Sequence, residues 1–125
     1  MKVRLFHDSI RFRLSRDEVE TLSRQGRLEN VTRFAPARSL VCTLATAADV
    51  STLKARFEDS CITVLIPAAS ARRLLATDQL SISHEQPSGP QSSLKILIEK
   101  DFECLDAEKN EPGVKFFPNP RNATV

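Results

Sequence analysis

The chain has 125 residues, with 18 lysines and arginines against 16 acidic residues, so its formal net charge is only +2. This length suits one domain with a single core, and the charge balance excludes proteins that bind nucleic acid through net charge alone. No stretch approaches the roughly 20 apolar residues of a membrane span. Three widely separated cysteines without a C-x-x-C pair favour reduced thiols, and we expect a cytoplasmic protein.

Two short strands are predicted at the N-terminus, because apolar and charged residues alternate there with a period of two. Asp8 and Ser9 would form a two-residue turn between them. On the core side this turn pairs Val3 with Leu14, Leu5 with Phe12, and His7 with Ile10. The opposite side of the hairpin then carries Arg4, Arg11 and Arg13.

A short helix is predicted next, because Ser15 and Glu18 have the spacing of a capping box. Val19 and Leu22 give this helix an apolar side, and Gly26 is suited to end it. Strands at residues 28–34 and 40–46 follow, so the first part of the chain reads as strand, strand, helix, strand, strand.

The next stretch repeats this plan. A shift of 52 residues lays residues 2–22 on residues 54–74, and it aligns Lys2, Arg4, Ile10 and Leu22 with Lys54, Arg56, Ile62 and Leu74. The facing pattern is also preserved, since Ala55 would face Ile66 and Phe57 would face Val64. After Pro67, residues 68–76 predict a second helix, and strands at 80–85 and 94–100 are joined by the loop QPSGPQSS.

The predicted fold class is therefore α+β, mainly β. Two tandem ββαββ repeats, at residues 2–46 and 53–102, supply eight strands and two short helices. A barrel would close most economically over them, because closure leaves few exposed strand edges. We expect one barrel domain over residues 1–103, and a tail at 104–125 that packs on it through Phe116, Phe117 and Pro118; a docking motif for another protein is the alternative for this cluster. The sequence leaves open whether the halves exchange hairpins or pack side by side.

The second half resembles the swapped-hairpin barrel of AbrB/SpoVT-type proteins, whose pattern is D-x-x-G-R-V-x-I-P, a short helix, L-x-x-x-D-x-L-x-I and a closing strand. The matching residues are Asp59, Val64, Ile66, Pro67, Leu74, Asp78, Leu80 and Ile82. The resemblance implies two interlocked ββαββ units, here in one chain as in MraZ-like proteins, and DNA contacts from basic residues around the hairpin. The Gly-Arg step falls on Ile10-Arg11 and on Ile62-Thr63, so only the first half keeps the arginine. The two ends of the chain also look like uncharacterised bacterial proteins of similar length.

Basic residues recur at related places in the two halves. They are Arg4, Arg11 and Arg13 in the first half and Lys54, Arg56, Arg72 and Arg73 in the second. If the halves pack symmetrically, these side chains would form a surface for phosphates, and the protein would be a regulator-like module that binds DNA or another polyanion weakly. The alternative is that each is the solvated side of an amphipathic strand or helix, in a protein-interaction or small-ligand-binding domain with no nucleic-acid role.

Signals for catalysis are few. His7 and His84 are the only histidines, and with the cysteines they lack the close spacing of a metal site. Cys61 is the most exposed thiol expected, while Cys42 should be buried. The charged run at residues 99–103 suggests a third possibility, a phosphohydrolase of the triphosphate-tunnel type, although the E-x-E-x-K signature of that family is missing. We therefore predict a non-enzymatic protein without cofactor, metal or membrane association, either a monomer or a homodimer.

Overall fold

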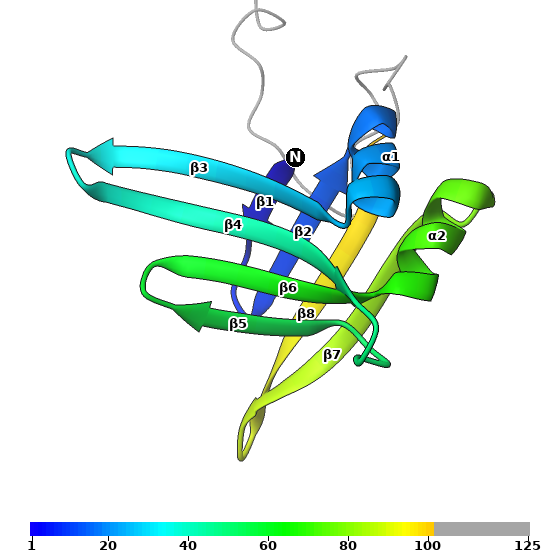
Figure 1. The fold of residues 1–125 in the computed structure, drawn as a ribbon. Helices are drawn as coiled ribbons and strands as arrows, with labels where there is room; N and C mark the ends of the chain where they lie inside the picture. Colours follow the sequence, from blue (N-terminus) through cyan, green and yellow to red (C-terminus); the bar gives the residue numbers. More distant parts are fainter. Residues whose placement is uncertain (102–125) are drawn as a thin grey trace, which may run out of the picture.

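The computed structural model of the chain describes residues 1–101; residues 102–125, with the predicted tail at 104–125, lie outside the described part. Eight strands and two helices follow one another along the chain (Figure 1), which confirms an α+β fold that is mainly β. They are β1 (Lys2–Leu5), β2 (Ser9–Leu14), α1 (Arg16–Gln25), β3 (Arg27–Ala35), β4 (Arg38–Ala47), β5 (Lys54–Glu58), β6 (Cys61–Pro67), α2 (Ala68–Ala76), β7 (Ser81–Gly89) and β8 (Ser92–Lys100).

Both helices begin and end at the residues that the sequence indicated. The Ser15 side chain accepts a hydrogen bond from the Glu18 backbone N–H (3.3 Å), and the Glu18 carboxylate accepts one from the Ser15 N–H (3.0 Å), so the capping box of α1 is complete. Gly26 ends the helix in the left-handed conformation, with φ of 78°. Helix α2 starts directly after Pro67 and packs beside α1 at one end of the molecule (Figure 1).

The strands form two four-stranded sheets, and each sheet takes one hairpin from each half of the chain. Sheet A has the order β1-β2-β8-β7, and sheet B has the order β3-β4-β6-β5 (Figure 1). Within each sheet the two central strands, β2 with β8 and β4 with β6, pair in parallel. The halves therefore exchange hairpins, which answers the question that the sequence left open.

The internal repeat is also visible in the strand register. In sheet A Ser9 of β2 is paired with Lys95 of β8, and in sheet B Cys61 of β6 is paired with Val41 of β4. Cys61 is the equivalent of Ser9 at a shift of 52 residues, and Lys95 is the equivalent of Val41 at a shift of 54 residues. The Lys95 N–H donates to the Asp8 carbonyl (2.9 Å), just as the Val41 N–H donates to the Ser60 carbonyl (3.1 Å). The two halves thus meet through equivalent backbone contacts, so the sheets are related by an approximate two-fold axis.

One core lies between the two sheets and under the helices. It is built by the central strands, by both helices and by Leu53, and its buried members are Ile10, Phe12, Leu14, Val19, Leu22, Cys42, Leu44, Leu53, Val64, Ile66, Ala71, Leu74, Ile96 and Ile98. Alternation in the strands places these side chains inward and their sequence neighbours outward. Each sheet is open, so the closed barrel is not shown and stays a prediction. Side chains bridge the sheet edges: Gln86 of β7 bonds to Ala55 of β5, and Asn30 of β3 bonds to Met1.

The predicted pairing register was wrong by two residues in the first hairpin of each half, β1–β2 and β5–β6. Val3 is paired with Phe12 rather than Leu14, and Ala55 with Val64 rather than Ile66. Phe6 and Ser9 exchange backbone hydrogen bonds, so the turn is at His7 and Asp8, and His7 adopts a positive φ of 50° on the surface rather than facing Ile10 in the core. A two-residue slip keeps every side chain on its predicted face, because the strand period is two.

The predicted loop QPSGPQSS is instead mostly strand. Strand β7 continues to Gly89 and β8 begins at Ser92, which leaves only Pro90 and Gln91 in the turn. Pro87 is tolerated because β7 is an edge strand, with no strand of residues 1–101 paired to its outer side. The ladder shifts register between Pro87 and Gly89, a bulge that repeats the one between Arg33 and Ala35 in sheet B.

Candidate functional site

The arginines of the first hairpin lie together on the outer face of sheet A. Ile10, Phe12 and Leu14 of β2 point into the core, so Arg11 and Arg13 between them point outward. Arg4 of β1 is the direct partner of Arg11 across the ladder, so it shares the same face. We name this outer face of sheet A the arginine face; by register it holds Lys2, Arg4, Phe6, Ser9, Arg11, Arg13, Ser81, Ser83, Glu85, Lys95, Leu97 and Glu99.

Carboxylates compensate part of the positive charge on this face. A single Glu99 oxygen contacts the Nε atoms of both Arg11 (3.1 Å) and Arg13 (2.6 Å), and Lys2 pairs with Asp101 at 2.8 Å. The hydrogen bond from Lys2 is the main cause that lowers the pKa of Asp101. Counting Asp101, five basic and three acidic side chains occupy the face, so its local excess is two positive charges.

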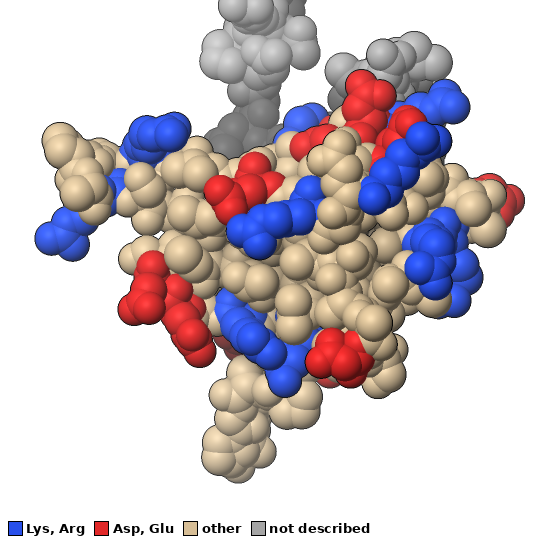
Figure 2. Space-filling model, in the orientation of Figure 1, with Lys and Arg blue, Asp and Glu red and all other residues tan. Residues whose placement is uncertain are grey.

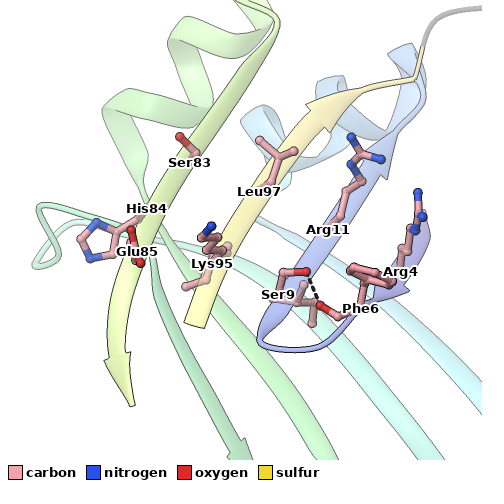
Figure 3. Close-up of a pocket in the computed structure, with 11 residues that line it drawn as sticks. Arg4, Phe6, Ser9, Arg11, Ser83, His84, Glu85, Lys95 and Leu97 are labelled. Atoms are coloured by element: carbon pink, nitrogen blue, oxygen red, sulfur yellow. Dashed lines mark hydrogen bonds between the residues drawn. The ribbon is translucent and has the colours of Figure 1, made fainter. Parts of the chain in front are cut away.

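A groove of about 820 Å³ crosses the arginine face from the β1–β2 turn to the middle of β8 and β7. Arg4 and Arg11 line one side, Ser83 and Glu85 the other, and Lys95 lies between them (Figure 3). Further lining comes from Phe6, Ser9, Ile10, His84, Ile96 and Leu97. This volume falls in the range of small-molecule sites in proteins, about 300–1,000 Å³.

An aromatic group adds to the basic side of the groove. The Phe6 side chain is 61 % exposed, and the Arg4 guanidinium carbon lies 5.9 Å from its ring centroid, within the distance of a cation–π contact. His7 meets the edge of the same ring, with centroids 4.4 Å apart. The turn is held by the Ser9 hydroxyl, which donates to the Phe6 carbonyl (2.5 Å; Figure 3). Phe6 is therefore presented beside Arg4 by a hydrogen-bonded turn.

The basic residues of the second half do not join the arginine face. Lys54 and Arg56 point to the outer face of sheet B, and Arg72 and Arg73 lie exposed on α2, where Arg73 donates to the Ser70 hydroxyl (3.2 Å). Figure 2 shows the sheet B side of the molecule, where uncharged surface separates the charged groups. The outer faces of two packed sheets point away from each other, and α2 belongs to neither sheet. The structure therefore divides the predicted basic surface among sheet A, sheet B and α2.

Sequence reasoning missed Lys95, which completes the basic lining of the groove. The alternation of Lys95, Leu97 and Glu99 with Ile96 and Ile98 does reveal an outward side. No local pattern, however, indicates that β8 lies parallel to β2, since the paired residues Ser9 and Lys95 are far apart in the sequence. That pairing alone brings Lys95 to the first-hairpin arginines.

Other candidate chemistry is dispersed over the molecule. Cys42 is buried in the core as expected, and burial raises the pKa of its thiol, whereas Cys61 lies partly exposed at the start of β6. His84 of β7 lines both the groove and a smaller cavity of about 330 Å³ that Lys54 also lines. Among residues 1–101, no three histidine, cysteine or acidic side chains come together in a way that could hold a metal ion.

Among residues 1–101, neither helix has the length and hydropathy needed to cross a bilayer.

Comparison with known proteins found no matching curated protein and no matching solved structure. One family profile does match, and it covers residues 1–121, nearly the whole chain. The chain therefore belongs to the family described as "Family of unknown function (DUF7009)".

Proposed function

We propose that the protein is a non-enzymatic binding module that holds a phosphate-bearing polyanion, DNA included, on the arginine face. The observation that carries the proposal is the convergence of Arg4, Arg11 and Lys95 on one groove of about 820 Å³. Guanidinium groups bind phosphate oxygens in a fixed fork geometry, and the lysine adds a mobile point charge. The hydroxyl of Ser83 supplies a further donor at the same groove, whereas the Ser9 hydroxyl already donates to the Phe6 carbonyl.

The exposed Phe6 ring supports a nucleic-acid ligand in particular. Proteins that bind single strands combine a basic groove with aromatic side chains on which bases stack. Phe6 stands at the basic side of the groove and is 61 % exposed. Because Glu99 already pairs with Arg11 and Arg13, the face offers few uncompensated charges. We therefore expect weak binding whose affinity falls with salt by a shallow slope, since few phosphate contacts release few counterions.

The resemblance to AbrB/SpoVT-type proteins is part of this proposal. The exchange of hairpins between the two ββαββ halves supports a single-chain relative of AbrB/SpoVT-type proteins. The side-chain bridges between the sheet edges support a barrel-like closure. In this account the protein acts in the cytoplasm and reaches its ligand through the first hairpin, which keeps Arg11 where the second half has Thr63.

The test is a titration of a short fluorescent DNA duplex, its single strand and inorganic polyphosphate, followed by anisotropy across a salt series. Binding at low salt should weaken as salt rises. On a duplex, a plot of the logarithm of the binding constant against the logarithm of the salt concentration should have a slope of about −0.9 for each phosphate contact. The variant Arg4→Gln/Lys95→Gln should lose about two units of slope, and it leaves the two arginine contacts of Glu99 in place. Lys54→Gln/Arg56→Gln removes the same charge from sheet B and should bind normally. Absence of binding to all three probes at the lowest salt would overturn the proposal.

A second candidate function is protein interaction through the outer face of sheet B. The positions equivalent to Arg11, Arg13 and Lys95 are Thr63, Leu65 and Val41 there, so the centre of this face is uncharged (Figure 2). Light scattering tests its simplest form, in which two copies meet on this face. A concentration-dependent dimer that Thr63→Lys abolishes would support it, and a monomer at every concentration would contradict it.

A further inference from the structure

The hairpin of β3 and β4 extends well beyond its neighbours in sheet B. Figure 1 shows its end reaching past the turn between β5 and β6. Every residue from 31 to 38 is exposed, and Phe34 is 72 % exposed, the largest value among the exposed large apolar side chains of residues 1–101. We call residues 31–40 the arm. An aromatic side chain so far from the core contributes little buried area to the fold.

Arginines flank the apolar tip of the arm on both sides. The tip reads Arg33-Phe34-Ala35-Pro36-Ala37-Arg38. Arg33 is paired with Ser39, while Arg38 is paired with Ala35 across a bulge. Because Arg38 and Ser39 are consecutive in β4, they point to opposite faces of the ribbon, so Arg33 and Arg38 also lie on opposite faces. Figure 2 shows basic side chains on two sides of this tip.

The second copy of the hairpin shows that the fold does not require this composition. Its tip reads Pro87-Ser88-Gly89-Pro90-Gln91-Ser92, with the equivalent bulge and a proline at the equivalent place. It has neither a charged nor an aromatic residue. The bulge and the proline are therefore what the hairpin geometry shares, whereas the two arginines and Phe34 are specific to the arm.

The arm combines a rigid apolar wedge with two lateral guanidinium groups. Pro36 fixes its own φ and Ala37 has a positive φ of 59°, as in a turn of type II. Proteins that bind the DNA minor groove insert Phe or Pro between base steps, and they place Arg against the walls of the narrow groove. A two-stranded ribbon is also an established way to enter a DNA groove.

We infer that the arm inserts into the minor groove of duplex DNA, with Phe34 entering between base steps and Arg33 and Arg38 contacting the groove walls and phosphates on either side. The inference rests on the proposed polyanion-binding function for its class of partner, and it specifies that partner as duplex DNA. It adds a second contact, on sheet B, to the arginine face on sheet A. Insertion of this kind unstacks a base step and kinks the duplex.

Bending of a duplex labelled with a donor and an acceptor at its ends is the direct readout. Wild-type protein should shorten the end-to-end distance, and Phe34→Ala should abolish this change and weaken binding at least about fivefold, the lower end of the effect of losing one stacked aromatic. Phe57→Ala is the matched control, because Phe57 is 71 % exposed but lies on another hairpin. Arg33→Gln/Arg38→Gln should make the slope of log affinity against log salt shallower by the amount that corresponds to about two phosphate contacts. Circular dichroism checks that each variant is folded.

The outcomes separate this inference from the proposed function. If Arg4→Gln/Lys95→Gln weakens binding while the arm variants bind and bend DNA like wild type, the arm inference fails and the arginine face stands. If only the arm variants lose binding and bending, the arm stands and the face fails. Equal binding to duplex and single strand without bending also overturns the arm inference, as does binding to anionic phospholipid vesicles in place of DNA. If no probe binds, both fail.

Discussion

The side-chain amide of Gln86 bonds to both backbone groups of Ala55. The Gln86 Oε1 atom accepts from the Ala55 N–H (2.8 Å), and the Nε2 group donates to the Ala55 carbonyl (3.0 Å). Gln86 belongs to the edge strand β7 of sheet A and Ala55 to the edge strand β5 of sheet B. One side chain thus takes the place of a neighbouring strand and joins two sheets that share no ladder.

We expect Gln86→Ala to lower the free energy of unfolding by about 1–3 kcal/mol, since two net hydrogen bonds are lost at a partly buried junction. For a domain of this size the midpoint of thermal unfolding should fall by several degrees, about 4–8 °C per kcal/mol. Gln91→Ala, at the exposed tip of the same hairpin, is the control and should leave the midpoint unchanged. A Gln86→Ala midpoint equal to that of the control would show that the bridge contributes nothing to stability.

Gly26 links the end of α1 to β4, and substitution should be costly there. Its φ of 78° is in the left-handed region, and an added Cβ would lie 2.8 Å from the Thr46 hydroxyl oxygen. We expect Gly26→Ala to destabilise the fold by about 1–2 kcal/mol from the backbone conformation alone. Chemical denaturation measures this loss. The double variant with Thr46→Ala should recover only the part due to the clash, and a fully stable Gly26→Ala would contradict this account of the cap.

Glu18 should make stability depend on pH in the acid range. Partial burial opposes its ionisation, but hydrogen bonds from the N-terminal ammonium and from Ser15 outweigh burial, so the pKa of Glu18 lies below 4.5. Ionised Glu18 therefore stabilises the fold above pH 4.5, its value in the unfolded chain, and this contribution disappears as the pH falls through the lower folded value. The midpoint of thermal unfolding should be higher for wild type than for Glu18→Gln at neutral pH, and this difference in midpoint should disappear on acidification. A difference that stays constant would refute this role.

The two cysteines in the described part should differ in reactivity. Burial raises the pKa of the Cys42 thiol and shields it, whereas Cys61 is partly exposed at the β5–β6 turn. Because the thiolate is the reactive form, a maleimide reagent at neutral pH should modify Cys61 and spare Cys42 until denaturant is added. Peptide mapping by mass spectrometry distinguishes the sites. Rapid labelling of Cys42 in the native protein would contradict the core packing.

The elements were predictable because their determinants lie close together in the sequence. Ser15 and Glu18 are three residues apart and define the start of α1 directly. The alternation of Ile10, Phe12 and Leu14 likewise assigns the inner face of β2, and it does so even though the predicted pairing register was wrong by two residues. Turn position depends on which residue accepts a positive φ, and His7 gave no such signal.

The candidate site was predictable only in part, because it depends on contacts between distant segments. Arg4, Arg11 and Arg13 share a face by alternation within one hairpin, which the sequence shows. Lys95 reaches them only because β8 lies parallel to β2. For the same reason the sequence could not show that Lys54 and Arg56 point away on the other sheet. The internal repeat predicted equivalent positions in the two halves, and the exchange of hairpins placed them on opposite outer faces.

Matched charge removal from the arginine face and from sheet B with α2 tests the central claim most directly. Anisotropy at low salt would compare wild type with Arg4→Gln/Arg11→Gln/Arg13→Gln on sheet A and with Lys54→Gln/Arg56→Gln/Arg72→Gln, which removes equal charge elsewhere. Binding through the arginine face predicts that the first variant loses affinity for the DNA duplex and polyphosphate by at least about tenfold, while the second stays close to wild type. Equal affinities of the two variants, whether both are reduced or both are unchanged, would contradict the claim.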